Sequence, residues 1–132
     1  MLLSCLSISL SCGRSNTAEW QPDPDARLHV YFFHTSERCP ACLAVEENTE
    51  AVLEKNFKAM TEDGTIDYQS FDLGMKENRA VAEKYQISYT SLLIIRSDGT
   101  LTDFTNNAMN YANTSPDKFR EMLKTEIGKN LE

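Results

Sequence analysis

Residues 28–42 read LHVYFFHTSERCPAC, the strongest indication of fold in the sequence. Leu28 to Phe33 is rich in β-branched and aromatic residues, which is typical of a mostly buried strand. A polar turn over 34–38 follows the strand, and Cys39-Pro40-Ala41-Cys42 then opens a helix. Pro40 suits the first helical turn because its missing N–H would have no intrahelical partner there. The stretch therefore predicts a strand, a loop and a helix, with two cysteines at the strand-to-helix junction.

The rest of the chain alternates helices and strands. Apolar residues recur at three- and four-residue steps from Cys42 until Asp63-Gly64, which predicts one long helix. Asp98-Gly99 is a strong hairpin signal, and Ser115-Pro116-Asp117 is a typical helix start. The other expected elements are a strand over 66–71, a helix over 76–85, and strands over 92–95 and 101–104. The order βαβαββα predicts an α/β sandwich, a central mixed sheet with helices on both faces.

The 132 residues predict one domain preceded by a leader and a linker. Residues 1–12 are apolar and uncharged, as in the core of an export signal. Small residues around Cys12 resemble a loose bacterial lipobox with Cys12 as the lipidation site. The letters around Cys5 fit that pattern better, but almost no apolar segment precedes Cys5. A cleaved signal without lipid and a frayed end of a cytosolic protein are the alternatives. Residues 13–25 are a polar linker with two prolines, and 26–132 form the domain.

Composition excludes several classes of function. A formal net charge of −7 without a Lys/Arg-rich stripe argues against nucleic-acid binding. No apolar run reaches the roughly 18–20 residues of a membrane span, so a lipid anchor would be the only membrane contact. The sequence carries no nucleotide or flavin signature, and we therefore expect no cofactor.

Cys39 and Cys42 carry the expected chemistry. Cys39 stands directly before the helix, which places its sulfur near unpaired backbone N–H groups and the positive end of the helix dipole. Both favour the thiolate over the thiol. Cys42 lies one turn further on, within disulfide reach and more buried. An exposed nucleophile with a resolving partner is what thiol–disulfide exchange requires.

Three other uses of this cysteine pair remain open. A zinc site would lack a second cysteine pair, and His29 and His34, five apart on a strand, would face opposite sides. Copper(I) held by two thiolates, with His34 as a further ligand, is reasonable chemistry for an exported protein. A purely structural disulfide would close a very small loop and stabilise little through chain entropy. We favour redox exchange and expect no metal.

These features resemble the thioredoxin-like superfamily over residues 26–127. That family has the same element order with Cys-x-x-Cys at its first helix. Tyr85-Gln86-Ile87 and residues 92–95 are similar to its Tyr-x-Ile segment and central strand, and Ser97-Asp98-Gly99 resembles its hairpin turn. The Arg-Cys-x-x-Cys signature is similar to that of small exported bacterial thioredoxin-like proteins. The resemblance implies a redox-active Cys39–Cys42 disulfide that exchanges with protein thiols and disulfides.

The chain departs from the family pattern beside the expected site. Ser91, preceded by Thr90, stands where thioredoxins have a cis-proline. A cis bond to a non-proline residue costs roughly 2.5–4 kcal/mol, so we expect a trans bond and a reshaped substrate loop. Tyr31 takes the place of the family's buried acid, and Arg38 that of the tryptophan before the first cysteine. Tyr89 and Thr90 are expected to flank the site, although Tyr89 could equally be a core aromatic.

Charged groups near the pair have two interpretations each. The Arg38 guanidinium would favour the Cys39 thiolate, partly offset by Glu37, or both are solvated loop charges. His34 could pass a proton to Cys42, or it could merely end the strand. An acidic run predicts a solvated face of the first helix, with docking to a basic partner as the alternative; it comprises Glu46, Glu47, Glu50 and Glu54.

The sequence therefore predicts an exported thiol–disulfide oxidoreductase, periplasmic or in the cell envelope, with Cys39 as nucleophile and Cys42 as resolving cysteine. A membrane-associated redox partner is implied, because the chain cannot draw electrons from a cofactor of its own. The sequence does not give the direction, reductase or oxidase. A copper-binding or redox-inert interaction module and a scaffolding adaptor are the alternatives, since the fold alone does not establish activity.

Overall fold

A central sheet of four strands, in the order β2-β1-β3-β4, organises the computed structural model, which describes residues 20–132. β2 is parallel to β1, whereas β3 is antiparallel to β1 and β4 is antiparallel to β3. The sheet is therefore mixed, as predicted. The strand bounds are β1 Leu28–His34, β2 Ile66–Asp72, β3 Ser91–Arg96 and β4 Leu101–Asp103.

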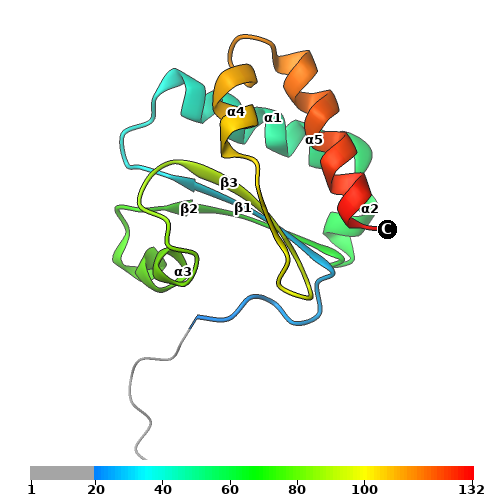
Figure 1. The fold of residues 1–132 in the computed structure, drawn as a ribbon, viewed down its shortest axis with the longest axis horizontal. Helices are drawn as coiled ribbons and strands as arrows, with labels where there is room; N and C mark the ends of the chain where they lie inside the picture. Colours follow the sequence, from blue (N-terminus) through cyan, green and yellow to red (C-terminus); the bar gives the residue numbers. More distant parts are fainter. Residues whose placement is uncertain (1–19) are drawn as a thin grey trace, which may run out of the picture.

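Helices cover both faces of this sheet. Figure 1 shows α1, α4 and α5 on one face and α3 on the other. The α/β, thioredoxin-like sandwich predicted from the sequence is thus confirmed. The helix bounds are α1 Pro40–Asn56, α2 Lys58–Glu62, the 3₁₀ turn η1 Lys76–Asn78, α3 Arg79–Lys84, α4 Thr105–Tyr111 and α5 Pro116–Asn130.

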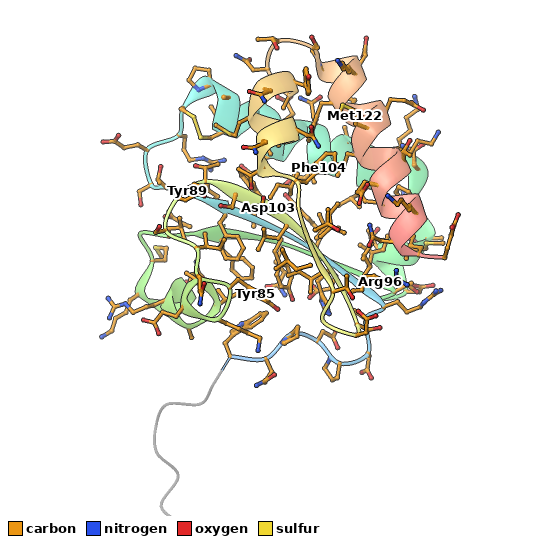
Figure 2. All side chains as sticks on the ribbon, in the orientation of Figure 1. Tyr85, Tyr89, Arg96, Asp103, Phe104 and Met122 are labelled. Carbon is orange, nitrogen blue, oxygen red and sulfur yellow. A yellow bond between two sulfur atoms is a disulfide. The ribbon has the colours of Figure 1, made fainter. Side chains whose placement is uncertain are left out.

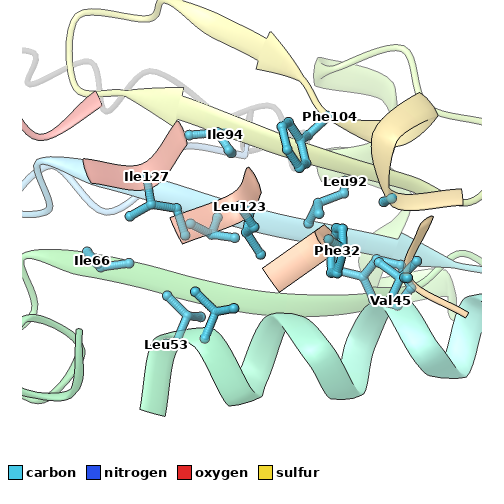
Figure 3. Close-up of a cluster of buried hydrophobic side chains, with 14 of the residues drawn as sticks. Phe32, Val45, Leu53, Ile66, Leu92, Ile94, Phe104, Leu123 and Ile127 are labelled. Carbon is cyan, nitrogen blue, oxygen red and sulfur yellow. The ribbon is translucent and has the colours of Figure 1, made fainter. Parts of the chain in front are cut away.

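β1 is buried along its whole length because it is central and covered on both faces. Successive side chains of a strand point to opposite faces. Val30 and Phe32 join the cluster under α1, α4 and α5, whereas Tyr31 and Phe33 join a smaller cluster on the α3 face. Figure 3 shows the larger cluster, where Phe32 lies among residues of α1, β3 and α5.

Two details of the helices differ from the prediction. The expected single helix after Cys42 is divided at Phe57, whose backbone (φ −134°, ψ 23°) leaves the helical region while its side chain packs against the core. α4 was not expected, because its sequence TNNAMNY has no apolar period and buries only Ala108. A hydrogen bond from α1 fixes the end of α4: the Asn48 side chain donates to the carbonyl of Ala112, the C-cap residue of α4, over 3.2 Å.

The N-terminal part of the described chain returns to the α3 face of the sheet. Trp20, which the sequence places in the linker, packs edge-to-face on Tyr31, Phe71 and Tyr85 at centroid distances of 5.6, 6.2 and 6.0 Å. The predictions for Cys5 and Cys12 lie outside the described residues. Between residues 20 and 132, no helix has the length and apolar character needed to cross a membrane.

The topology brings three loops to one edge of the sheet. β1 and β2 end there because they are parallel, and β3 begins there because it is antiparallel to β1. His34 pairs with Asp72, and Phe33 pairs with Ser91. The loop into α1, the loop after β2 and the loop before β3 therefore meet at this edge.

Candidate active site

Cys39 and Cys42 form a disulfide at the N-terminus of α1, with their Cα atoms 5.1 Å apart. Cys39 is the N-cap residue, and its sulfur accepts a hydrogen bond from the Cys42 N–H over 3.1 Å. Pro40 occupies the first turn, where no N–H is needed. Cys39 is exposed, whereas Cys42 is only 4% exposed. A partner can reach the outer sulfur, and the inner sulfur is shielded.

The loop before β3 lies against the inner sulfur. The Thr90 hydroxyl is 3.5 Å from Cys42 Sγ. The peptide bond between Thr90 and Ser91 is trans, as predicted. Ser91 is buried, and its hydroxyl donates to the Tyr89 carbonyl over 2.9 Å. Proline could not make this bond, so this loop is fixed differently from a proline-bearing one.

Two large exposed side chains, Tyr89 and Leu43, lie at the same end of the sheet as the disulfide. Tyr89 is 65% exposed, which excludes its alternative role as a core aromatic, and Figure 2 shows it at the same end of the sheet as the start of α1. Leu43, directly after Cys42, is also exposed. These two residues provide apolar surface on which a polypeptide substrate could rest.

The loop into α1 is fastened to the end of β2. The Leu73 N–H donates to the His34 carbonyl over 2.8 Å, and the Ser36 hydroxyl donates to the Asp72 carboxylate over 2.9 Å. The Gly74 N–H also bonds this carboxylate, over 2.8 Å. The bonds from Gly74 and Ser36 hold the pKa of Asp72 below its ordinary value. The residues before Cys39 are therefore anchored rather than free.

Arg38 forms an ion pair with Glu46 of α1. The Glu46 carboxylate also accepts a hydrogen bond from the Ser70 hydroxyl of β2 over 2.9 Å. Burial opposes ionisation of Glu46, but the bonds from Arg38 and Ser70 outweigh it and lower the pKa of Glu46. Of the two interpretations of Arg38, a freely solvated loop charge does not describe its ion pair with Glu46, and Glu46 is less solvated than the predicted acidic helix face implied. Glu46 lies one helical turn after Cys42, and this spacing was the available sequence signal for its place at the site.

His34 is buried at the end of β1, and its Nδ1 lies 3.0 Å from the Thr35 carbonyl oxygen. Its ring rests 5.6 Å from that of Phe32, on the face covered by α1. Within residues 20–132, no hydrogen bond joins it to either cysteine. His34 thus lies close to the site but forms no hydrogen bond with the sulfurs among the described residues.

Tyr31 does not occupy the position expected for a buried acid, because it points to the α3 face, away from α1. Its hydroxyl donates to Asp67 over 2.9 Å, and His29 Nδ1 lies 3.1 Å from the same carboxylate oxygen. Burial and then the Asp67 carboxylate raise the pKa of Tyr31.

The described residues offer no obvious metal centre. His29 and His34 lie on opposite faces of β1, as expected from their spacing. No group of three or more His, Cys, Asp or Glu side chains between residues 20 and 132 has an arrangement that could hold a metal ion. This finding leaves the two-sulfur copper alternative untested, because it needs only the reduced cysteines and one further ligand.

A cavity of about 500 Å³ lies on the α3 side of the sheet, next to the edge where the loop that carries Cys39 meets the loop after β2. Leu73, Ala82 and Ile87 contribute apolar lining, and the positively charged Lys76 and Arg79 also line the cavity. The cavity borders the site because Leu73, which lines it, donates a backbone hydrogen bond to His34 at the end of β1, just before the loop into α1.

Comparison with known proteins gives only distant likeness. No protein-family model matches the chain, and no curated protein is similar to it in sequence. One similar structure is that of a malarial protein, 16% identical, with a TM-score of 0.42 over 66% of this chain and 97% of that chain. Another is a zinc-bound form of human ERp44, 16% identical, with a TM-score of 0.48 over 74% of this chain. This chain spans 26% of that ERp44 chain.

Proposed function

We propose that this protein is an exported thiol–disulfide oxidoreductase that acts through Cys39 and Cys42. The observation that carries the proposal is the asymmetry of the pair: an exposed sulfur at a helix N-cap beside a buried sulfur one turn later. A helix N-terminus stabilises the thiolate that such exchange needs.

The exchange proceeds in two displacements. A substrate thiolate attacks Cys39 Sγ, which forms a mixed disulfide and releases Cys42 as the thiolate. A second substrate thiol, once deprotonated, attacks the substrate sulfur of the mixed disulfide and releases Cys39 as the thiolate. The substrate loses two electrons and two protons and gains a disulfide, while the protein becomes the dithiol. The reverse sequence reduces a substrate disulfide, with Cys42 resolving the mixed disulfide.

The cellular setting belongs to the same proposal. The apolar, uncharged residues 1–12 support export to the periplasm or cell envelope, with Cys12 or Cys5 as the residue for lipid attachment. Turnover then needs a membrane-associated redox partner that returns the Cys39–Cys42 pair to its starting state. Globomycin treatment of expressing cells tests the lipid: accumulation of an unprocessed precursor supports it, and unchanged processing counts against it.

Catalysed reduction of insulin by dithiothreitol tests the activity. All variants carry Cys5→Ser and Cys12→Ser, so that only the two body cysteines can react. We expect the parent to accelerate the reaction, Cys39→Ser to abolish the acceleration, and Cys42→Ser to accumulate a mixed disulfide through Cys39. A parent no faster than dithiothreitol alone contradicts the proposal. Stoichiometric copper(I) bound by such an inactive, reduced protein would favour the metal-binding alternative.

A further inference from the structure

The Arg38–Glu46 ion pair lies directly beside the disulfide in both sequence and space. Arg38 precedes Cys39, and Glu46 follows Cys42 by four residues on α1. Helix residues at this spacing share a face, with Cβ atoms about 5–6 Å apart. One positive and one negative charge therefore lie close to the two cysteines in sequence and on α1.

The pair is held more firmly than a typical surface ion pair. The Arg38 side chain is 31% exposed and the Glu46 side chain 21% exposed. Ser70 fixes the Glu46 carboxylate from β2 over 2.9 Å. Partial burial reduces screening by water and salt, so each charge acts on its neighbours more strongly than it would in solvent.

Other charged and titratable groups face the pair from the elements packed around it. β1 contributes His34, the loop contributes Glu37, and β2 contributes Tyr68 and Asp72. Glu50, which follows Glu46 by one turn, accepts a hydrogen bond from Tyr68. α4, the helix that packs beside α1, has no charged residue. These side chains are the same in the parent and in variants that neutralise either member of the pair.

We propose that Arg38 and Glu46 set the reduction potential of the Cys39–Cys42 couple by acting in opposite directions. Reduction adds two electrons and two protons to the disulfide, and ionisation of Cys39 then places a negative charge at the N-terminus of α1. Arg38 stabilises that charge and so favours the reduced form, whereas Glu46 disfavours it. The inference concerns regulation of the proposed exchange site and rests on that function for its biological meaning.

The test measures the equilibrium of the disulfide and two glutathione thiols with the dithiol and glutathione disulfide. After acid quenching, alkylation followed by mass measurement counts the free thiols in the Cys5→Ser, Cys12→Ser background. Glu46→Gln should raise the equilibrium constant for protein reduction about three- to tenfold, which is about 15–30 mV towards a more oxidising couple. Arg38→Gln should lower it by a similar factor, and the double variant should return close to the parent.

Conservative and distant variants separate charge from structure. Arg38→Lys keeps the charge and should leave the equilibrium constant near that of the parent. Glu54, at the far end of α1, forms an ion pair with Lys58 of α2, and Glu54→Gln or Lys58→Gln should leave the equilibrium constant unchanged. A pair that served only as a structural clamp would lower the free energy of unfolding in both single variants without moving the potential in opposite directions.

Potentials that move in the same direction, or not at all, overturn the inference even if insulin reduction is normal. Opposite shifts that cancel in the double variant support it, and they remain measurable if insulin reduction fails. Failure of the inference and failure of the proposed function are therefore distinguishable.

Discussion

The Thr90 hydroxyl lies 3.5 Å from the Cys42 sulfur, so the buried cysteine contacts a polar group from the loop before β3. The peptide bond between Thr90 and Ser91 is trans, and this loop places the Thr90 hydroxyl against the buried sulfur. Thr90 is therefore the residue through which this loop can affect the resolving cysteine.

Removal of that hydroxyl should slow resolution. In the reduced protein, a nitrothiobenzoate adduct on Cys39 is displaced by Cys42, and absorbance follows release of the dye. Thr90→Val should slow this release about three- to tenfold, because one hydrogen bond contributes about 0.5–1.5 kcal/mol. Thr90→Ser keeps the hydroxyl and should behave like the parent, as should Thr114→Val on the exposed surface. Parent-like release from Thr90→Val would show that the contact is not used.

The N-cap position of Cys39 predicts how its reactivity depends on pH. In the reduced Cys5→Ser, Cys12→Ser protein, the rate of iodoacetamide alkylation at Cys39 should rise around a midpoint at least one unit below the free-thiol pKa of about 8.5. Cys42 should stay unmodified at pH 7 because it is buried. The same protein unfolded in urea should show the ordinary midpoint for both thiols. A native midpoint near 8.5 would falsify the argument that the helix N-terminus activates the sulfur.

The sequence predicted those parts of the fold that follow from local pattern. The β1 strand, the Cys-x-x-Cys junction and the Asp98-Gly99 turn each carry strong short-range signals, and the structure has all three. α4 was missed because it is polar and is held by tertiary contacts, such as the bond from Asn48. Helix propensity is a local property of the sequence, so it cannot predict a hydrogen bond from a residue 64 positions away.

The charges around the site were harder to predict than its sulfurs. The Arg38–Glu46 pair depends on how the loop folds back over α1, and the bond to Glu46 from Ser70 depends on the β2 register. Tyr31 was assigned by counting along an alignment, but the alternation of β1 decides its face. Sequence spacing predicted the Cys39–Cys42 pair, whereas only the three-dimensional structure placed its electrostatic neighbours.

Trp20 should contribute to stability although it precedes the predicted domain. Its ring is partly buried against Tyr31, Phe71 and Tyr85. Trp20→Ala should lower the free energy of unfolding by about 2 kcal/mol, less than the 3–5 kcal/mol typical of a fully buried aromatic. Urea denaturation followed by far-UV circular dichroism measures this, since the variant loses the chain's one tryptophan. Gln21→Ala, at the exposed neighbouring residue, should leave the free energy of unfolding unchanged. If Trp20→Ala and Gln21→Ala were equally stable, the packing of Trp20 on the sheet would contribute no stability.

Asp67 should make stability depend on pH in the acid range. Its hydrogen bond to His29 lowers its pKa, burial opposes this, and the bonds from Tyr31 and Gln69 lower it further. A carboxyl with a lowered folded-state pKa contributes stability above its unfolded value of about 3.9, and this contribution is lost as the pH falls through the folded-state pKa. Asp67→Asn should therefore lower the free energy of unfolding at pH 7 by about 1–3 kcal/mol.

The difference between parent and Asp67→Asn should shrink as the pH falls below 4, because the parent carboxyl then becomes neutral as well. Urea denaturation at several pH values between 7 and 2.5 follows this convergence. Glu121→Gln removes an exposed carboxylate from α5 and should track the parent at every pH. A difference for Asp67→Asn that stays constant across the range would mean that the carboxylate charge contributes nothing and that only its shape matters.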